Sequence, residues 1–203
     1  MGSTIQRFSH LPIEIQLFAE NTDGLSIRYN EAIESTKNAP ALLVFVHDDV
    51  EITDWFWHER LVAALESHHL VGLAGNTNPL PHQTSWAVTD LKGTLSDQQF
   101  WSGRVARSNG HWDLFGTPDR TVKLIDGLFM AAYSQTFHDN KIRFDPQFTF
   151  HHYDMDISKQ FTSKDLSIYV PSISAIHYGQ NNIGQAWQES AQRYLSKWSG
   201  MNK

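Results

Sequence analysis

The 203-residue sequence contains no cysteine. Disulfides and thiolate metal sites are therefore excluded, and any bound metal must be held by oxygen atoms and imidazole rings. The chain also has no excess of positive charge, since its net charge is -6 and its isoelectric point is about 6.0. This charge balance argues against general nucleic-acid binding and against electrostatic attachment to a membrane.

Long hydrophobic runs are absent as well. The apolar runs are far shorter than the roughly 20 residues needed to span a bilayer, and the N-terminus lacks the apolar stretch of a signal peptide. We therefore expect a soluble, cytoplasmic protein. Hydrophobic residues make up 40% of the chain, which is enough for a sizeable core, and no repeat or linker divides the sequence. A single domain over residues 1–203 is predicted.

Strand and helix patterns alternate in the first half of the chain. Strands are predicted at residues 13–18, 42–46 and 70–75, and helices at residues 26–37 and 54–67. This β-α-β-α-β order favours an α/β fold with a mostly parallel central sheet flanked by helices.

The second half of the chain is less regular. Residues 77–121 are rich in Pro, Gly, Ser, Asn and Trp, and only short strands near residues 86–88 and 103–107 are predicted there. Later predicted elements are a strand interrupted at Asp126-Gly127, a helix beginning near Asp154 to Asp156, one or two strands ending at His177, and a final helix carrying Trp187, Tyr194 and Trp198. Long irregular segments within compact domains are often functional.

Ionisable side chains follow several predicted strands. His47, Asp48 and Asp49 come directly after the strand at residues 42–46, and His177 ends a later strand. Ligands of open α/β sheets bind at the carboxyl ends of the strands, so these side chains are expected to converge. One or two carboxylates are enough for Mg²⁺, and Mn²⁺ tolerates imidazole better than Mg²⁺ does. Asp49 and His177 are therefore predicted to bind a divalent cation.

Structural interpretations of the same residues remain open. Asp48 or Asp49 can cap the following helix, and Asp156 suits an N-cap better than a catalytic role. A single histidine after a strand is often structural. Trp86 and Trp101 can either form core or offer a stacking surface to a sugar.

Several segments, in order, resemble the glycosyltransferases of the GT-A fold, especially their family-2-like group. The motifs that carry the resemblance are a strand ending in HDD, a later DG-hydrophobic segment and a stretch of the FxFYDxD type. The segments read YNEAIESTKNAPALLVFVHDDVEI, VGLAGN, SWAV, LIDGLFMAAY, FDPQFTFHHYDMDISKQ and AIHYG. Each motif is weak, whereas their order and spacing are fairly specific.

The resemblance implies roles for individual residues. HDD would be a variant of the family's DxD signature, with Asp49 binding the metal and Asp48 lying near the ribose or diphosphate of the donor. His47 stands where many relatives have the first aspartate. Asp154 would be the general base that takes the proton from the acceptor hydroxyl.

The resemblance also implies donor and acceptor contacts. Asp126 and Gly127 would line the sugar and acceptor side, and Asn30 and Trp86, in the segments YNEAIES and SWAV, are assigned to the same site. His177 would be a further ligand of the metal or the diphosphate.

The expected activity is an Mn²⁺- or Mg²⁺-dependent, inverting transfer of a sugar. The expected donor is a nucleoside-diphosphate sugar, with UDP-sugar the first choice, and the acceptor is a hydroxyl on a carbohydrate or another molecule, as in polysaccharide biosynthesis. GT-A enzymes normally open with a strand, a loop and a helix that hold the nucleobase, but only about a dozen residues precede Ile13. The strand at residues 13–18 is therefore matched to the second strand of the family, and a shortened N-terminus is expected.

Two alternatives stay open at this point. The first is a non-catalytic or regulatory glycosyltransferase-like domain that binds a carbohydrate or a partner protein. The second is a phosphoester hydrolase, which would need ligands for two metals roughly 3.5 to 4 Å apart, and the sequence offers no recognisable set of this kind.

Overall fold

The computed structural model describes residues 12–179 and 183–199. The helices are α2 (Leu25–Ser35), α3 (Trp57–Leu65), α4 (Ser134–Asp139), α5 (Tyr153–Thr162) and α6 (Gln185–Trp198), with a short 3-10 helix at Gln98–Phe100. The strands are β1 (Leu42–Val46), β2 (Val50–Ile52), β3 (Leu70–Gly72), β4 (Ala74–Asn76), β5 (Trp101–Arg107), β6 (Trp112–Gly116), β7 (Arg120–Val122), β8 (Leu124–Ile125), β9 (Phe129–Tyr133), β10 (Ile168–Val170) and β11 (Ala175–His177). None of the helices in these ranges is both long and apolar enough to cross a bilayer.

The strands form two mixed sheets. One has the order β1-β9-β3-β10-β7, and the other has the order β2-β11-β5-β4-β8 with β6 added beside β5. Within the described ranges, β10 with β3 and β11 with β5 pair in parallel, and the other named pairs are antiparallel. The α/β class is confirmed, whereas the prediction of a mostly parallel sheet is wrong. The reason is that β9 enters between β1 and β3 and runs antiparallel to both.

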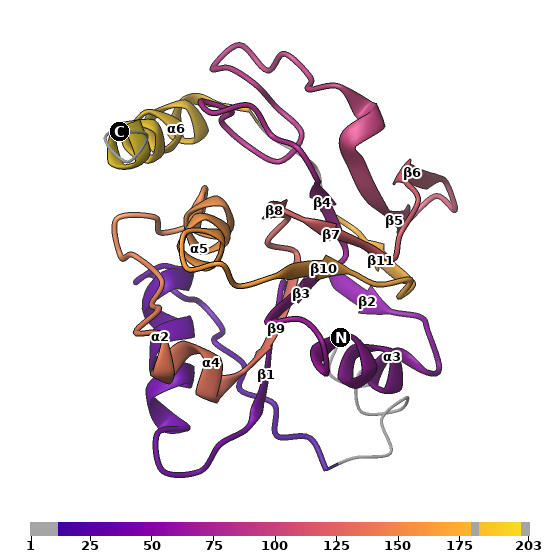
Figure 1. Ribbon diagram of the computed structural model, residues 1–203, viewed down its shortest axis with the longest axis vertical. Coiled ribbons are helices and arrows are strands. Elements are labelled where there is room, and N and C mark those ends of the chain that lie inside the picture. Colours follow the sequence, from indigo (N-terminus) through magenta and orange to yellow (C-terminus); the bar gives the residue numbers. More distant parts are fainter. Residues whose placement is uncertain (1–11, 180–182, 200–203) are drawn as a thin grey trace.

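Helices cover both faces of the first sheet, with α2, α4 and α5 on one side and α3 on the other (Figure 1). Alternate residues of β9 serve the two faces, as expected for a strand buried on both sides. Met130 and Ala132 pack in the core cluster that includes residues of α2 and α5, and Phe129 and Ala131 pack in the cluster that includes α3. Strand β9 therefore packs into both halves of the core.

Three strand predictions need correction. Residues 13–18 form an irregular, largely exposed segment rather than a strand. The segment LVGLAG is not one strand, because the chain passes at Leu73 from β3 in one sheet to β4 in the other. Residues 86–88 form a loop in which Val88 makes a single bridge to Leu95.

The other main elements were predicted. The helices α2, α3 and α6 and the strand β1 lie where the sequence placed them, each within a few residues.

Close packing at Leu73 explains the glycine of β5: Gly103 has a φ of 104°, and a Cβ there would lie 2.1 Å from the Leu73 carbonyl oxygen. Any larger residue at position 103 would push the two strands apart.

Candidate metal and catalytic site

Three side chains at the ends of strands point toward one another. His47 follows β1, Asp49 lies in the turn between β1 and β2, and His177 ends β11. His47 Nδ1 is 4.0 Å from Asp49 Oδ1, and His177 Nε2 is 3.5 Å from Asp49 Oδ2. One potential ligand atom from each residue lies within 4.8 Å of the other two. We call these three residues the HDH cluster.

Strand pairing brings His177 to Asp49 across 128 positions of sequence. Strand β11 pairs antiparallel with β2, which sets His177 opposite Val50, the residue after Asp49. The backbone N–H of Tyr178 then donates to the Asp49 carbonyl oxygen at 2.9 Å. The predicted proximity of Asp49 and His177 is therefore confirmed, and their role as metal ligands stays a prediction.

The HDH cluster has the chemistry of a divalent-cation site. Asp49 Oδ1 is buried and has no hydrogen-bond partner among the described residues. A buried carboxylate oxygen of this kind destabilises the fold unless it accepts a hydrogen bond or binds a cation. Burial lowers the pKa of His47 even though Asp126 and Asp49 attract its proton, so the ring favours the neutral form that binds metals. Two imidazoles and one carboxylate suit Mn²⁺ better than Mg²⁺.

Two carboxylates face the site from neighbouring segments. Asp126 and Gly127 lie in the turn between β8 and β9, and Asp154 is in the first turn of α5. Asp154 Oδ2 accepts from Gly127 N at 3.0 Å and Oδ1 accepts from Met155 N at 2.9 Å. Asp126 Oδ1 accepts from Leu128 N at 2.9 Å. Backbone N–H groups of this turn and of α5 thereby fix both carboxylates.

The surroundings favour a protonatable carboxylate at Asp154. Burial raises the pKa of Asp154 from 3.8 to about 7, and the negative charge of Asp126 is the second-largest cause of this rise. The hydrogen bonds from Met155 and Gly127 lower the pKa but do not offset these two effects. A carboxylate with a pKa near the working pH is the usual property of a general base. Asp154 therefore has the environment that its predicted role requires.

Tyr153 joins the HDH cluster to the carboxylates. Its hydroxyl lies 2.5 Å from His47 Nε2 and donates to the Gly127 carbonyl oxygen at 3.0 Å. Gly127 has to be glycine, because a Cβ there would lie 2.3 Å from that hydroxyl. The sequence alone does not assign His47 to the metal set or Tyr153 to the site, although both are adjacent to the predicted site residues Asp48 and Asp154.

The structure places the remaining predicted residues in different surroundings. Asp48 is exposed in the turn beside Asp49. Trp86 is only 7% exposed and belongs to the core, where its indole N–H donates to Asp126 Oδ2 at 2.7 Å. Trp101 is 8% exposed and stacks edge-on against Trp86. These rings are core residues, and Trp86 positions a site carboxylate instead of presenting an open ring face.

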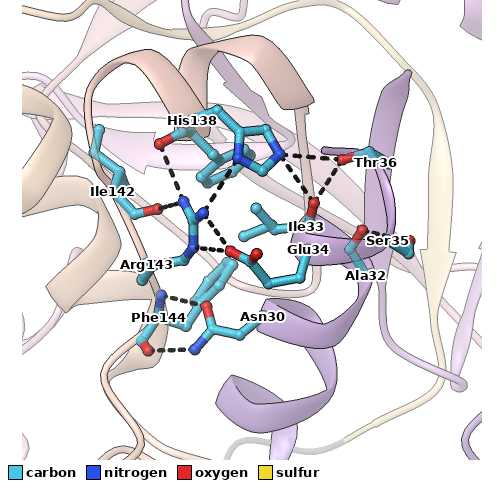
Figure 2. A network of polar contacts seen from close by, with 11 residues as sticks. Asn30, Ala32, Ile33, Glu34, Ser35, Thr36, His138, Ile142, Arg143 and Phe144 are labelled. Carbon is cyan, nitrogen blue, oxygen red and sulfur yellow. Dashed lines mark hydrogen bonds and ion pairs between the residues drawn. The ribbon is translucent and has the colours of Figure 1, made fainter. Parts of the chain in front are cut away.

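Asn30 belongs to a separate polar network that ties α2 to the segment after α4. Its amide donates to the Phe144 carbonyl at 2.8 Å and accepts from the Phe144 N–H at 2.9 Å (Figure 2). Glu34 of the same helix pairs with Arg143 in that network. The structure thus gives the Asn30 side chain a structural role and does not bring it into the HDH cluster.

Asp156 is not a helix cap. Helix α5 begins at Tyr153, so Asp156 lies one turn inside it, fully buried. Its carboxylate accepts from Trp198 Nε1 at 2.9 Å and from Gln160 Nε2 at 2.8 Å, and it pairs with Lys197 at 2.7 Å. Asp156 therefore anchors α6 to α5. The prediction of a cap was wrong because the helix starts earlier than its acidic residues suggested.

Comparison with known proteins gives the family. Residues 10–198 match the family model described as glycosyltransferase like family. The match covers most of the chain, and the chain therefore belongs to this glycosyltransferase-like family. A comparison with curated proteins yields no match. Family membership supports a general role in glycosyl transfer, with a sugar donor and an acceptor as partners.

Proposed function

We propose that the protein is a metal-dependent, inverting glycosyltransferase that moves a sugar from a nucleoside-diphosphate sugar to an acceptor hydroxyl. The observation that carries the proposal is the hydrogen-bond path from the HDH cluster through Tyr153 and Gly127 to Asp154. A cation-binding set and a carboxylate of raised pKa are the two devices that such a transfer needs. They are adjacent here on one fixed framework.

The residues divide the chemistry between them. His47, Asp49 and His177 would hold Mn²⁺, which when bound supplies positive charge against the diphosphate leaving group. Asp154 accepts the proton of the acceptor hydroxyl as its oxygen attacks the anomeric carbon. Asp126 helps to keep the pKa of Asp154 near neutrality. Attack from the face opposite the leaving group inverts the anomeric configuration.

Release of nucleoside diphosphate tests this proposal. Purified protein is incubated with UDP-, GDP- and dTDP-sugars and with saccharide or simple alcohol acceptors, in Mn²⁺ or in EDTA. We expect Mn²⁺-dependent release that Asp154→Asn lowers by about 10²- to 10⁴-fold. Asp139→Asn is the matched control, because Asp139 is exposed on α4. The anomeric configuration of the product, followed by NMR, should be opposite to that of the donor.

Full activity in EDTA would contradict the proposed metal dependence. If no donor is turned over but a carbohydrate binds, the non-catalytic domain is the better account. Retention of the donor's anomeric configuration would contradict the role of Asp154 as a general base in a single displacement.

A further inference from the structure

Arg107 connects a neighbouring hairpin to the wall of the HDH cluster. It ends β5, where it pairs in parallel register with His177 of β11. One guanidinium nitrogen, Nη1, donates to the Gly179 carbonyl oxygen at 3.0 Å. The Nε of the same group donates to Asp113 Oδ2 on the adjacent strand β6. Arg107 thereby links β6, β5 and the segment that follows β11.

Gly179 forms part of the wall around the cluster. A Cβ at this position would lie 2.3 Å from Asp49 Oδ2 and 2.7 Å from His177 Nε2. The backbone at Gly179 is thus in direct contact with two of the three potential ligands. A displacement of this backbone would change the space between Asp49 and His177.

Two hydrogen bonds hold this segment from opposite sides. The Tyr178 N–H donates to the Asp49 carbonyl, and the Gly179 carbonyl accepts from Arg107. The first bond comes from the HDD turn itself, whereas the second comes from a different part of the sheet. Residues that orient metal ligands from outside the coordination sphere commonly control the affinity of a site.

We propose that Arg107, held in place by Asp113, is a positioning residue that sets the geometry of the HDH cluster through Gly179. The planar guanidinium serves two acceptors at a fixed angle, which a lysine ammonium cannot reproduce. Both side chains are about three-quarters buried, with exposed fractions of 26% and 24%, and their geometry is therefore constrained by packing. This inference rests on the proposed function only in requiring that the cluster binds a divalent cation.

Direct titration with Mn²⁺ alone tests the role of Arg107. Binding is followed by the loss of the free Mn²⁺ EPR signal for the full chain and its variants. Arg107→Met and Asp113→Ala should each weaken Mn²⁺ binding by about 10- to 100-fold, and Arg107→Lys should restore only part of the affinity. The double variant should bind like Arg107→Met, since both changes break one connection.

Arg104→Met is the matched control. Arg104 lies on the same strand, with its guanidinium over the Trp112 ring at 5.6 Å, and its loss removes the same charge. This variant should bind Mn²⁺ like the wild type. Melting temperatures measured in EDTA show whether each variant is folded, and Arg107→Lys provides the test if Arg107→Met is not.

The outcomes separate the two proposals. If the wild type does not bind Mn²⁺, the proposed metal dependence fails first. If the wild type binds and folded Arg107 and Asp113 variants bind equally well, only the positioning role is overturned. Normal Mn²⁺ binding with loss of nucleotide binding in Arg107→Lys would also overturn it, because Arg107 would then contact the nucleotide directly.

Discussion

The hydroxyl of Tyr153 lies 2.5 Å from His47 Nε2, although 106 positions separate the two residues. The tyrosine begins α5 and the histidine follows β1, so this contact ties a helix start to a strand end. The same hydroxyl donates to Gly127 O, and the Gly127 N–H donates to Asp154. The proposed metal ligands and the proposed base therefore share one hydrogen-bonded framework.

Tyr153→Phe tests this framework. The change leaves His47 Nε2 and the Gly127 carbonyl without the hydroxyl, and an unsatisfied buried group costs about 1–3 kcal/mol. We expect the free energy of unfolding, measured in urea, to fall by that amount. Mn²⁺ binding should also weaken, because His47 loses its orienting partner. Tyr169→Phe is the control, since Tyr169 stacks on His68 away from the cluster. Unchanged Mn²⁺ affinity in Tyr153→Phe would show that the framework does not orient His47.

Asp154 predicts a distinct pH dependence of activity. With its pKa raised to about 7, the base is ionised only toward alkaline pH, so kcat/KM should rise with pH through about 7. Asp154→Asn should abolish this rise along with most of the turnover. A rate that is flat between pH 5 and pH 9 would place the base elsewhere, with Asp126 as the next candidate.

The raised pKa of Asp154 also makes the stability of the fold depend on pH, and stability should fall over the pH range in which activity rises. Because the folded-state pKa is raised, the folded protein binds more protons than the unfolded chain between pH 3.8 and about 7. The free energy of unfolding of the wild type should therefore fall, relative to Asp154→Asn, as pH rises through this window. Urea titrations of both proteins at several pH values measure the difference. A constant difference would show that the pKa of Asp154 is not raised.

Asp156 should matter for folding and not for metal binding. Asp156→Ala removes the acceptor of Trp198 Nε1 and an ion-pair partner of Lys197. We expect the free energy of unfolding to fall by about 1–3 kcal/mol, because the indole N–H is left unsatisfied. Lys197 keeps Asp145 as a partner, which limits the cost. Mn²⁺ affinity should stay at the wild-type value, and a large drop in a folded variant would contradict the separation of the two roles.

The sequence predicted the local features better than the long-range ones. Strand β1, the HDD turn and the proximity of His177 to Asp49 could be predicted, because hydrophobic runs mark the strands and charged residues come at their ends. The direction of β9 did not, because a fully buried strand has the same apolar pattern whether it runs parallel or antiparallel. The irregular segment at residues 13–18 alternates polar and apolar residues like a strand, but no strand in the part of the chain that the structure describes pairs with it.

The site was predicted in part for similar reasons. Asp49 could be predicted from its place at the end of a hydrophobic strand, and Asp154 from the resemblance of its segment to GT-A glycosyltransferases, although helix capping is a common alternative for carboxylates at such positions. The contribution of Tyr153 depends on an approach to Gly127 that only the packed fold creates. Asp156 looked like a cap from its spacing, while two of its actual partners, Lys197 and Trp198, lie on α6, about 40 residues further along the chain.

The residue types of the proposed metal site predict which cation it prefers. Two imidazoles and one carboxylate should bind Mn²⁺ at least about tenfold more tightly than Mg²⁺. Saturating Mn²⁺ should raise the melting temperature, since a ligand at 100 times its dissociation constant adds roughly 2.7 kcal/mol of stability. Competition between the two cations, followed by EPR, measures the ratio. Equal affinities would argue that imidazoles do not coordinate the cation.

Calorimetric titration of nucleoside diphosphates, with UDP first, tests the central claim most directly. The wild type and Asp49→Ala are each titrated in Mn²⁺ and in EDTA, and circular dichroism confirms that both are folded. We expect at least one nucleoside diphosphate to bind the wild type in Mn²⁺, and we expect this binding to be lost in EDTA and in Asp49→Ala. Equal binding by the wild type in EDTA, or by Asp49→Ala in Mn²⁺, would contradict it.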